Sequence, residues 1–138
     1  MFDSQQTGWR GNLSQTDRRR KVLIVDDEPT TSETLAFIFA RHGYEARYAL
    51  SAEEAIQVTA EWAPEFALID VMLPGMDGIA LAIAICSKHR GCRILLFTGD
   101  MRTAELLMSE KNSDRSFQIL AKPISPAVLL ETAKRLLA

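Results

Sequence analysis

The chain has 138 residues, of which 47% are hydrophobic and 25% are charged, and its formal net charge is −2 at pH 7. A chain of this length can bury a sufficient core as one domain, so neither a disulfide nor a metal ion is needed for stability. The negative net charge excludes a protein that binds nucleic acid through general basicity, and we predict no direct nucleic-acid partner.

The cysteines and the apolar runs bear on the cellular location of the protein. Cys86 lies in an apolar run and Cys92 follows it closely, which is typical of reduced thiols in a cytosolic protein, and we interpret both as small core residues. The N-terminal residues contain no apolar core of a signal peptide. The longest apolar run, residues 79–86, is far shorter than the roughly 20 residues of a membrane span. The sequence therefore predicts a cytoplasmic protein without membrane insertion.

Residues 1–20 differ in composition from the remainder. They are rich in Gln, Ser, Thr, Gly and Arg, show no helical or strand period, and carry four arginines against two aspartates. This composition predicts a flexible polar tail before a folded domain at residues 21–138. We interpret the three arginines at residues 18–20 as a solvated run, with contact to an acidic partner surface as the alternative.

From residue 21 onward, short apolar runs alternate with helical patterns, which predicts βαβ units around a parallel sheet. Five such pairs fit the chain. The expected strands are residues 22–25, 44–50, 66–71, 93–97 and 117–121. The expected helices are residues 29–42, 52–62, 78–89, 101–111 and 126–138.

Capping residues support these helix boundaries. Ser51 with Glu54 three residues later is a capping-box pattern, and Ser125 precedes Pro126, which is favoured in the first turn of a helix. His42 closes the apolar stripe of the first helix, and we interpret it as a helix-end residue rather than a ligand.

Polar side chains follow four of the five predicted strands. Asp26 and Asp27 follow the first strand, Asp70 the third, Thr98 the fourth and Lys122 the fifth. In an open parallel sheet, ligand sites lie beyond the carboxyl ends of the strands. If the second strand lies at an edge, these five side chains converge on one crevice.

The chemistry of this set points to phosphoryl transfer. Two like charges at about 4 Å repel by about 4 kcal/mol at an effective dielectric of 20, so three carboxylates need more positive charge than Lys122 supplies. No His or Cys cluster suggests zinc, whereas carboxylate oxygens suit Mg²⁺. A carboxylate beside Mg²⁺, an ammonium and a hydroxyl can attack a phosphoryl group whose charged oxygens the cations neutralise.

Each residue also has a simpler interpretation when taken alone. Asp26 could cap the first helix, Asp70 could be a turn residue at the end of a strand, Thr98 could be a cap, and Lys122 could be a surface charge. Their joint placement on four strand ends favours the site over these alternatives.

The motifs VLIVDDEP, LIDVMLPGMDG, LLFTG and LAKP follow one another over residues 21–138. With them, the sequence resembles the receiver domain of the two-component response-regulator family. The resemblance implies a flavodoxin-like α/β fold, a (βα)5 three-layer sandwich around a five-stranded parallel sheet of strand order 2-1-3-4-5. Since no effector domain is encoded, we expect a stand-alone, single-domain receiver that is a monomer or a weak dimer.

The resemblance also implies roles for the polar residues. Asp70 would accept a phosphoryl group from a sensor histidine kinase or a histidine phosphotransfer protein. Lys122 would pair with the phosphoryl oxygens, and the Thr98 hydroxyl would move to them as the switch. The bond between Lys122 and Pro123 would be cis.

The implied metal is Mg²⁺. Its ligands would be Asp26, Asp27 and Asp70, with the backbone carbonyl of Met72. The loop after Asp70 would be shaped by Pro74 and two glycines, Gly75 and Gly78.

The sequence departs from the family pattern in two places. Ile119 stands where receivers often place an aromatic residue that reports phosphorylation, so aromatic switching is not expected. The segment between the fourth strand and Lys122 is slightly longer than usual and lacks a common Gly-Ala pair, so the fourth helix is expected to be shaped differently.

The positions two residues after the phosphoacceptor and two after the switch hydroxyl also bear on the lifetime of the phosphorylated state. They hold Met72 and Asp100, which flank the path of attacking water in such domains. Apolar Met72 is expected to hinder hydrolysis.

The leading hypothesis is a phosphorylation-dependent signalling switch that acts through contact with a downstream protein. It is not an enzyme acting on a separate substrate, although such domains catalyse their own phosphoryl transfer and dephosphorylation. A phosphorylation-independent interaction module is the first alternative. The second is an aspartyl-phosphate phosphatase, which is disfavoured because such enzymes place the nucleophile on the first strand in an Asp-x-Asp pattern and carry a cap.

Overall fold

The computed structural model describes residues 18–111 and 117–138. Most of the predicted tail and the connection at residues 112–116 therefore lie outside the described residues. Within the described ranges, no helix is both long and apolar enough to cross a membrane.

The described residues form alternating strands and helices, as the sequence predicts. The strands are β1 (Lys21–Val25), β2 (Glu45–Ala49), β3 (Phe66–Asp70), β4 (Arg93–Thr98) and β5 (Gln118–Ala121). The helices are α2 (Pro29–Arg41), α3 (Ala52–Glu61), α4 (Gly78–Lys88), α5 (Met101–Glu110) and α6 (Pro126–Leu137). Each agrees with its expected range to within one or two residues.

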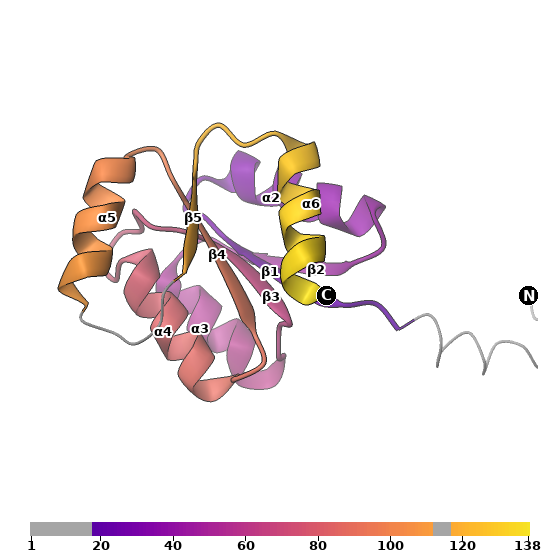
Figure 1. Cartoon of the computed structure of the whole chain (residues 1–138). Coiled ribbons are helices and arrows are strands. Elements are labelled where there is room, and N and C mark those ends of the chain that lie inside the picture. The colour runs from indigo at the N-terminus through magenta and orange to yellow at the C-terminus, as the bar shows by residue number, and fades with distance from the viewer. Residues whose placement is uncertain (1–17, 112–116) are drawn as a thin grey trace, which may run out of the picture.

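The strands form one parallel sheet in the order β2-β1-β3-β4-β5. Helices cover both faces of this sheet, with α2 and α6 on one side and α3, α4 and α5 on the other (Figure 1). The predicted flavodoxin-like three-layer sandwich is therefore confirmed. Strand β2 lies at an edge, which is the condition for the four polar strand ends to converge.

Side-chain alternation along the central strands divides the core into two clusters. Val22 and Ile24 of β1 pack with Phe39 of α2 and Leu129 of α6. The other face of β1 packs with α3 and α4, and Ala104 of α5 belongs to the same cluster. Because successive side chains of a strand point to opposite faces, the residues of each central strand alternate between the two clusters.

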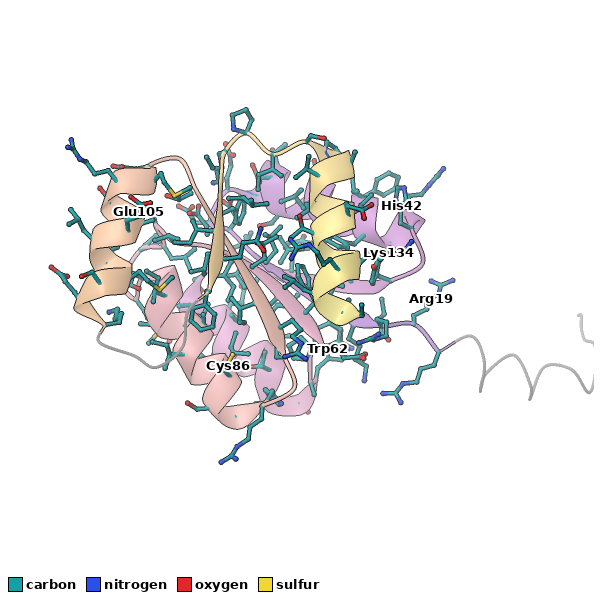
Figure 2. All side chains as sticks on the ribbon, in the orientation of Figure 1. Arg19, His42, Trp62, Cys86, Glu105 and Lys134 are labelled. Atoms are coloured by element: carbon teal, nitrogen blue, oxygen red, sulfur yellow. The ribbon has the colours of Figure 1, made fainter. Side chains whose placement is uncertain are left out.

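Both cysteines belong to the core. Cys86 and Cys92 are both buried, with 2% and 5% of their surfaces exposed. Figure 2 shows Cys86 turned inward from α4, whereas Glu105 projects from the outer surface of α5. Burial, and to a smaller extent the neighbouring Cys86, raises the pKa of the Cys92 thiol to about 12. The interpretation of both as small core residues is confirmed.

The helix starts follow the predicted caps with one difference. Ser51 accepts the Glu54 backbone N–H at 3.1 Å, and Ser125 accepts the Val128 N–H at 3.4 Å. The Glu54 carboxylate, however, accepts the N–H of Leu50 at 2.7 Å, one residue before the expected partner.

Helix α5 is the least buried of the described helices. Ala104 is its one fully buried residue. Its C-terminal end is held by an ion pair between Lys111 and Asp77, whose Nζ and Oδ2 atoms lie 2.9 Å apart. Asp77 also caps α4 by accepting the Ala80 N–H at 2.9 Å. This carboxylate therefore joins the start of α4 to the end of α5.

Asp77 is ionised more readily than a free aspartate. Burial raises the pKa of its carboxyl, but the Ala80 N–H and the Lys111 ammonium together outweigh burial and hold the pKa below the ordinary 3.8. A carboxyl whose folded pKa is depressed stabilises the fold above its unfolded pKa, and this contribution is lost as the pH falls through the folded value.

The variant Asp77→Asn keeps the capping oxygen and removes the charge. We expect it to be less stable than wild type by about 0.5 kcal/mol at neutral pH, since the ion pair is partly exposed. The difference should persist down to about pH 4 and shrink below it, because wild-type Asp77 then becomes neutral too. Urea denaturation of both proteins from neutral pH to below about pH 4 measures this difference in unfolding free energy, and Glu105→Gln serves as an exposed control. A difference that does not change with pH would contradict the assignment.

Candidate functional site

The backbone ladder continues beyond the strand ends and fixes the site residues. The N–H of Asp26 donates to Ala49 O at 3.2 Å, and the N–H of Lys122 donates to Thr98 O at 2.8 Å. By alternation, Asp26 follows Ile24, and Lys122 follows Leu120, onto the face covered by α2 and α6. Asp70 likewise follows Phe66 and Leu68 of β3 onto this face. Three strand ends thus direct their side chains to one place.

The centre of the site is one ammonium group shared by two buried carboxylates. Lys122 Nζ lies 3.0 Å from Asp26 Oδ2 and 3.0 Å from Asp70 Oδ2. Asp26 is 1% exposed and Asp70 is 5% exposed, while the Lys122 side chain keeps 32% of its surface accessible. The simpler interpretation of Lys122 as an isolated surface charge is therefore wrong.

Asp26 is held through all of its polar atoms. Its Oδ1 accepts the Glu28 N–H at 2.9 Å, and its carbonyl oxygen accepts the hydroxyl of Ser32 at 2.6 Å. The residue at the cap position of α2 is Glu28, not Asp26. The alternative that Asp26 is the helix cap is excluded by this geometry.

The electrostatics of the cluster favour an additional cation. Burial raises the pKa of the Asp70 carboxyl, and the charge of Asp26 adds to this, while the Met72 N–H and the Lys122 ammonium lower it less. Burial acts to lower the pKa of Lys122, but its bonds to Asp70 and Asp26 outweigh burial and raise it. The ammonium is therefore kept charged, and Asp70 still lacks full compensation.

The carboxylates fit a magnesium ion. Asp26, Asp27 and Asp70 each offer one oxygen, and these oxygens lie within 4.8 Å of one another. An all-oxygen set of ligands suits Mg²⁺ better than a softer metal. The Met72 N–H donates to Asp70 Oδ1 at 2.9 Å, which fixes the start of the loop. The carbonyl of Met72 as a further ligand stays a prediction.

Comparison with known proteins agrees with this geometry. The family model described as "Response regulator receiver domain" matches residues 22–134. The chain belongs to the response regulator receiver family. The structure is similar to a CheY-like receiver domain protein of Methanospirillum hungatei JF-1, at 27% identity and a TM-score of 0.76, over 86% of this chain and 94% of that chain.

Two further solved receivers are similar over nearly the same part of the chain. The receiver domain of a signal transduction histidine kinase from Syntrophus aciditrophicus is 30% identical with a TM-score of 0.72, and the match covers 86% of this chain and 89% of that one. The response regulator TrrA of Thermotoga maritima, solved with Mg²⁺ and BeF, is 28% identical with a TM-score of 0.72, over 85% and 98% of the two chains.

Thr98 of this receiver is fully buried at the end of β4. Its hydroxyl accepts the Asp100 N–H at 3.0 Å and donates to the Asp100 carbonyl at 3.3 Å. Among the described residues it makes no hydrogen bond to Asp70 or Lys122, so its switch role stays a prediction. The side chain that caps α5 is that of Asp100, not Thr98.

Two expectations about the surroundings of Lys122 can be compared with the structure. The peptide bond between Lys122 and Pro123 is cis, as the resemblance implies. Ile119, which stands in place of an aromatic residue, is half-buried against the core of the α3 and α4 face. It lies on the opposite face of β5 from Lys122 by alternation.

Two glycines shape the loop after Asp70. Gly75 has a φ of +83°, a left-handed conformation that favours glycine. Gly78 packs directly on the strand end, because a Cβ there would lie 2.1 Å from the Asp70 carbonyl oxygen. The position of the Asp70 backbone therefore depends on the absence of a side chain at residue 78.

Two contributors to the receiver site were not singled out from the sequence. They are Ser32, which holds the Asp26 carbonyl, and Phe97, whose ring lies 4.6 Å from Lys122 Nζ. Both occur in ordinary helix and strand patterns, so only their location in the fold reveals them.

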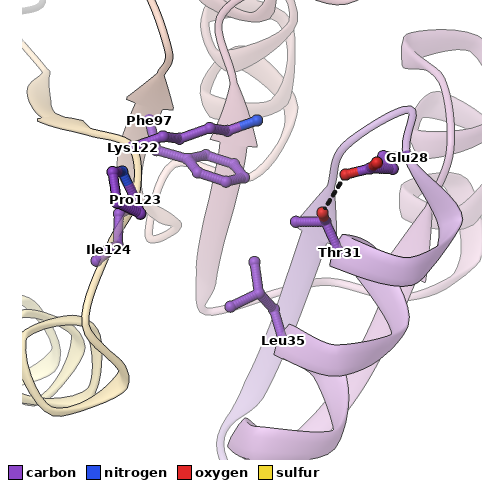
Figure 3. A pocket seen from close by; sticks show the side chains of 7 residues that line it. All are labelled: Glu28, Thr31, Leu35, Phe97, Lys122, Pro123 and Ile124. Carbon is purple, nitrogen blue, oxygen red and sulfur yellow. Dashed lines mark hydrogen bonds between the residues drawn. The ribbon is translucent and has the colours of Figure 1, made fainter.

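A cavity of about 460 Å³ opens beside Lys122 (Figure 3). Its walls come from the start of α2, from β4 and from the segment between β5 and α6. The lining residues are Glu28, Thr31, Leu35, Phe97, Lys122, Pro123 and Ile124. The cavity therefore reaches the ammonium group from outside the carboxylate cluster.

The variant Gly78→Ala tests the close contact with Asp70. We expect a loss of about 3 kcal/mol of unfolding free energy, because the added methyl group overlaps backbone atoms that cannot move aside easily. The matched control is Gly91→Ala, where no atom lies within 4 Å of the new Cβ, and which should change stability by less than about 0.5 kcal/mol. Chemical denaturation measures both, and equal effects would contradict the contact.

Proposed function

We propose that this receiver is a phosphorylation-dependent signalling switch in which Asp70 is the phosphoacceptor. The observation that supports the proposal most strongly is the sharing of the Lys122 ammonium by Asp26 and Asp70, with Asp27 close enough to complete a cation site. This arrangement supplies a carboxylate nucleophile and the positive charge that a transferred phosphoryl group requires.

In this reaction an Asp70 oxygen attacks the phosphorus atom while the bond from phosphorus to the donor atom breaks. Mg²⁺ held by Asp26, Asp27 and Asp70 would neutralise phosphoryl oxygens. The Lys122 ammonium would pair with phosphoryl oxygens. Both cations counter charge that grows on the phosphoryl group during transfer.

The phosphoryl donor is proposed to be a phosphohistidine of a sensor histidine kinase or a histidine phosphotransfer protein. Lys122, which would pair with the transferred group, also lines the cavity of about 460 Å³. The output is proposed to be contact with a downstream protein, since phosphorylation adds about −1.5 to −2 charges and new acceptors for Thr98 and Lys122. The domain has no separate substrate in this scheme.

The acceptor role is tested with a small phosphodonor such as acetyl phosphate in the presence of Mg²⁺. Wild type should gain the mass of one phosphoryl group, and Asp70→Asn should gain none, because an amide cannot act as the nucleophile. The control is Glu105→Gln, an exposed carboxylate on α5, which should be phosphorylated like wild type. Unchanged labelling of Asp70→Asn would reject the assignment.

The same variant separates the competing functions. If the protein is a phosphorylation-independent module, wild type and Asp70→Asn should bind the partner with the same affinity. An aspartyl-phosphate phosphatase would release phosphate catalytically from small phosphate esters, whereas a receiver should take up one phosphoryl group per chain.

Removal of Mg²⁺ should destabilise the protein. At a concentration of one hundred times its dissociation constant, the ion should add about 2.7 kcal/mol to the unfolding free energy. In Asp27→Asn most of this gain should vanish, while the metal-free protein becomes more stable because a like charge is removed. Thermal melts with Mg²⁺ and with a chelator measure both effects, with Glu61→Gln at the far end of α3 as control. An equal gain in all three proteins would place the ion elsewhere.

A further inference from the structure

Lys122 has to cross a strand to reach its partners. It follows β5, whereas Asp70 ends β3 and Asp26 follows β1, and β4 lies between them in the sheet. Neighbouring strands are about 4.8 Å apart, so Asp70 lies about two strand spacings from the Lys122 backbone. The Lys122 side chain must therefore run across the end of β4.

The residue of β4 that meets this side chain is Phe97. Lys122 Nζ lies 4.6 Å from the centroid of the Phe97 ring, and Figure 3 shows the ring beside the extended lysine stem. Phe97 is 2% exposed and packs in the cluster that joins β4 to α2 and α6. The ring is thus a fixed surface against which a flexible side chain rests.

Two physical effects follow from this contact. The face of an aromatic ring carries partial negative charge and attracts an ammonium group by about 0.5 to 2 kcal/mol, more when water is excluded. The ring also occupies the space on one side of the ammonium, because its centroid lies 4.6 Å from Lys122 Nζ. Without the ring, the long lysine chain would have more rotamers available.

We propose that Phe97 is a positioning residue for Lys122, whose ammonium it holds between Asp26 and Asp70 in readiness for the phosphoryl oxygens. The effect of Phe97 on phosphoryl transfer rests on the proposed function, whereas the contact between Phe97 and Lys122 does not. Phe97 does not touch the reacting atoms and acts through Lys122 alone.

The chain offers a matched control for the loss of this ring. Phe66 of β3 is 0% exposed and belongs to the same core cluster as Phe97, but it contacts Phe39 rather than Lys122. Phe97→Leu and Phe66→Leu therefore remove equivalent rings from one core. Phe97→Tyr keeps the ring and serves as the rescue variant.

The first measurement needs no phosphorylation. An aromatic ring shifts the proton resonances of groups lying over its face, so the ε-methylene protons of Lys122 should resonate upfield in the wild-type NMR spectrum. The shift should disappear in Phe97→Leu and persist in Phe66→Leu and Phe97→Tyr. An unchanged Lys122 shift in Phe97→Leu would overturn the proposal.

The second measurement uses acetyl phosphate with saturating Mg²⁺, at a temperature where all variants remain folded. Phe97→Leu should lower the maximal phosphorylation rate about 2- to 30-fold, the range that corresponds to the energy of the contact. Phe66→Leu should change it much less, and Phe97→Tyr should restore most of it. Equal rate losses in the two leucine variants would show a general packing effect and overturn the proposal.

The two measurements also separate this inference from the proposed function. If wild type takes up no phosphoryl group, the phosphoacceptor assignment fails, and the NMR comparison still decides whether Phe97 holds Lys122. If wild type is phosphorylated and Phe97→Leu keeps the full rate, the phosphoacceptor assignment stands and the positioning role is rejected.

Discussion

The shared ammonium of Lys122 is the interaction on which the site depends. It lies 3.0 Å from a carboxylate oxygen of Asp26 and 3.0 Å from one of Asp70, residues that are 96 and 52 positions away in the chain. Burying either carboxylate without a cation would cost several kcal/mol. The three strands must therefore be in register before the charges can be compensated. The site can therefore be complete only when the strands of the sheet are in the correct order.

Much of this arrangement follows from the sequence because it depends on local patterns. Apolar runs with helical patterns between them locate the strands, and the residue after each run marks the carboxyl end where ligands bind. Asp26, Asp70 and Lys122 were found in this way. The strand order was not, because periodicity does not tell which strands are neighbours, and it came instead from the resemblance of the motifs to receivers.

The contacts that the sequence did not reveal depend on the three-dimensional arrangement of the chain, one through long-range packing and two through the local backbone conformation. Phe97 has the pattern of any buried strand residue, and its contact with Lys122 exists only because β4 lies between β3 and β5. Ser32 is one of several hydroxyl residues near the start of α2, and only the fold shows its bond to the Asp26 carbonyl. The Glu54 carboxylate likewise accepts the N–H of Leu50, whereas the capping-box pattern predicts the N–H of Ser51. Residue spacing along the chain does not predict which atoms form these contacts.

The described helix with the fewest buried residues, α5, begins next to the site, which bears on how a change at Asp70 would reach a partner under the proposed function. The hydroxyl of Thr98 is bonded to the backbone of Asp100, and the Asp100 side chain caps α5. If the hydroxyl turned toward a phosphoryl group at Asp70, the bond that orders the start of α5 would be lost. Helix α5 has one buried residue, whereas α4 has six, so moving α5 exposes less apolar surface. Under the proposed function, α5 is therefore the helix whose displacement would cost the least apolar contact, and the Lys111–Asp77 ion pair at its other end would oppose that displacement.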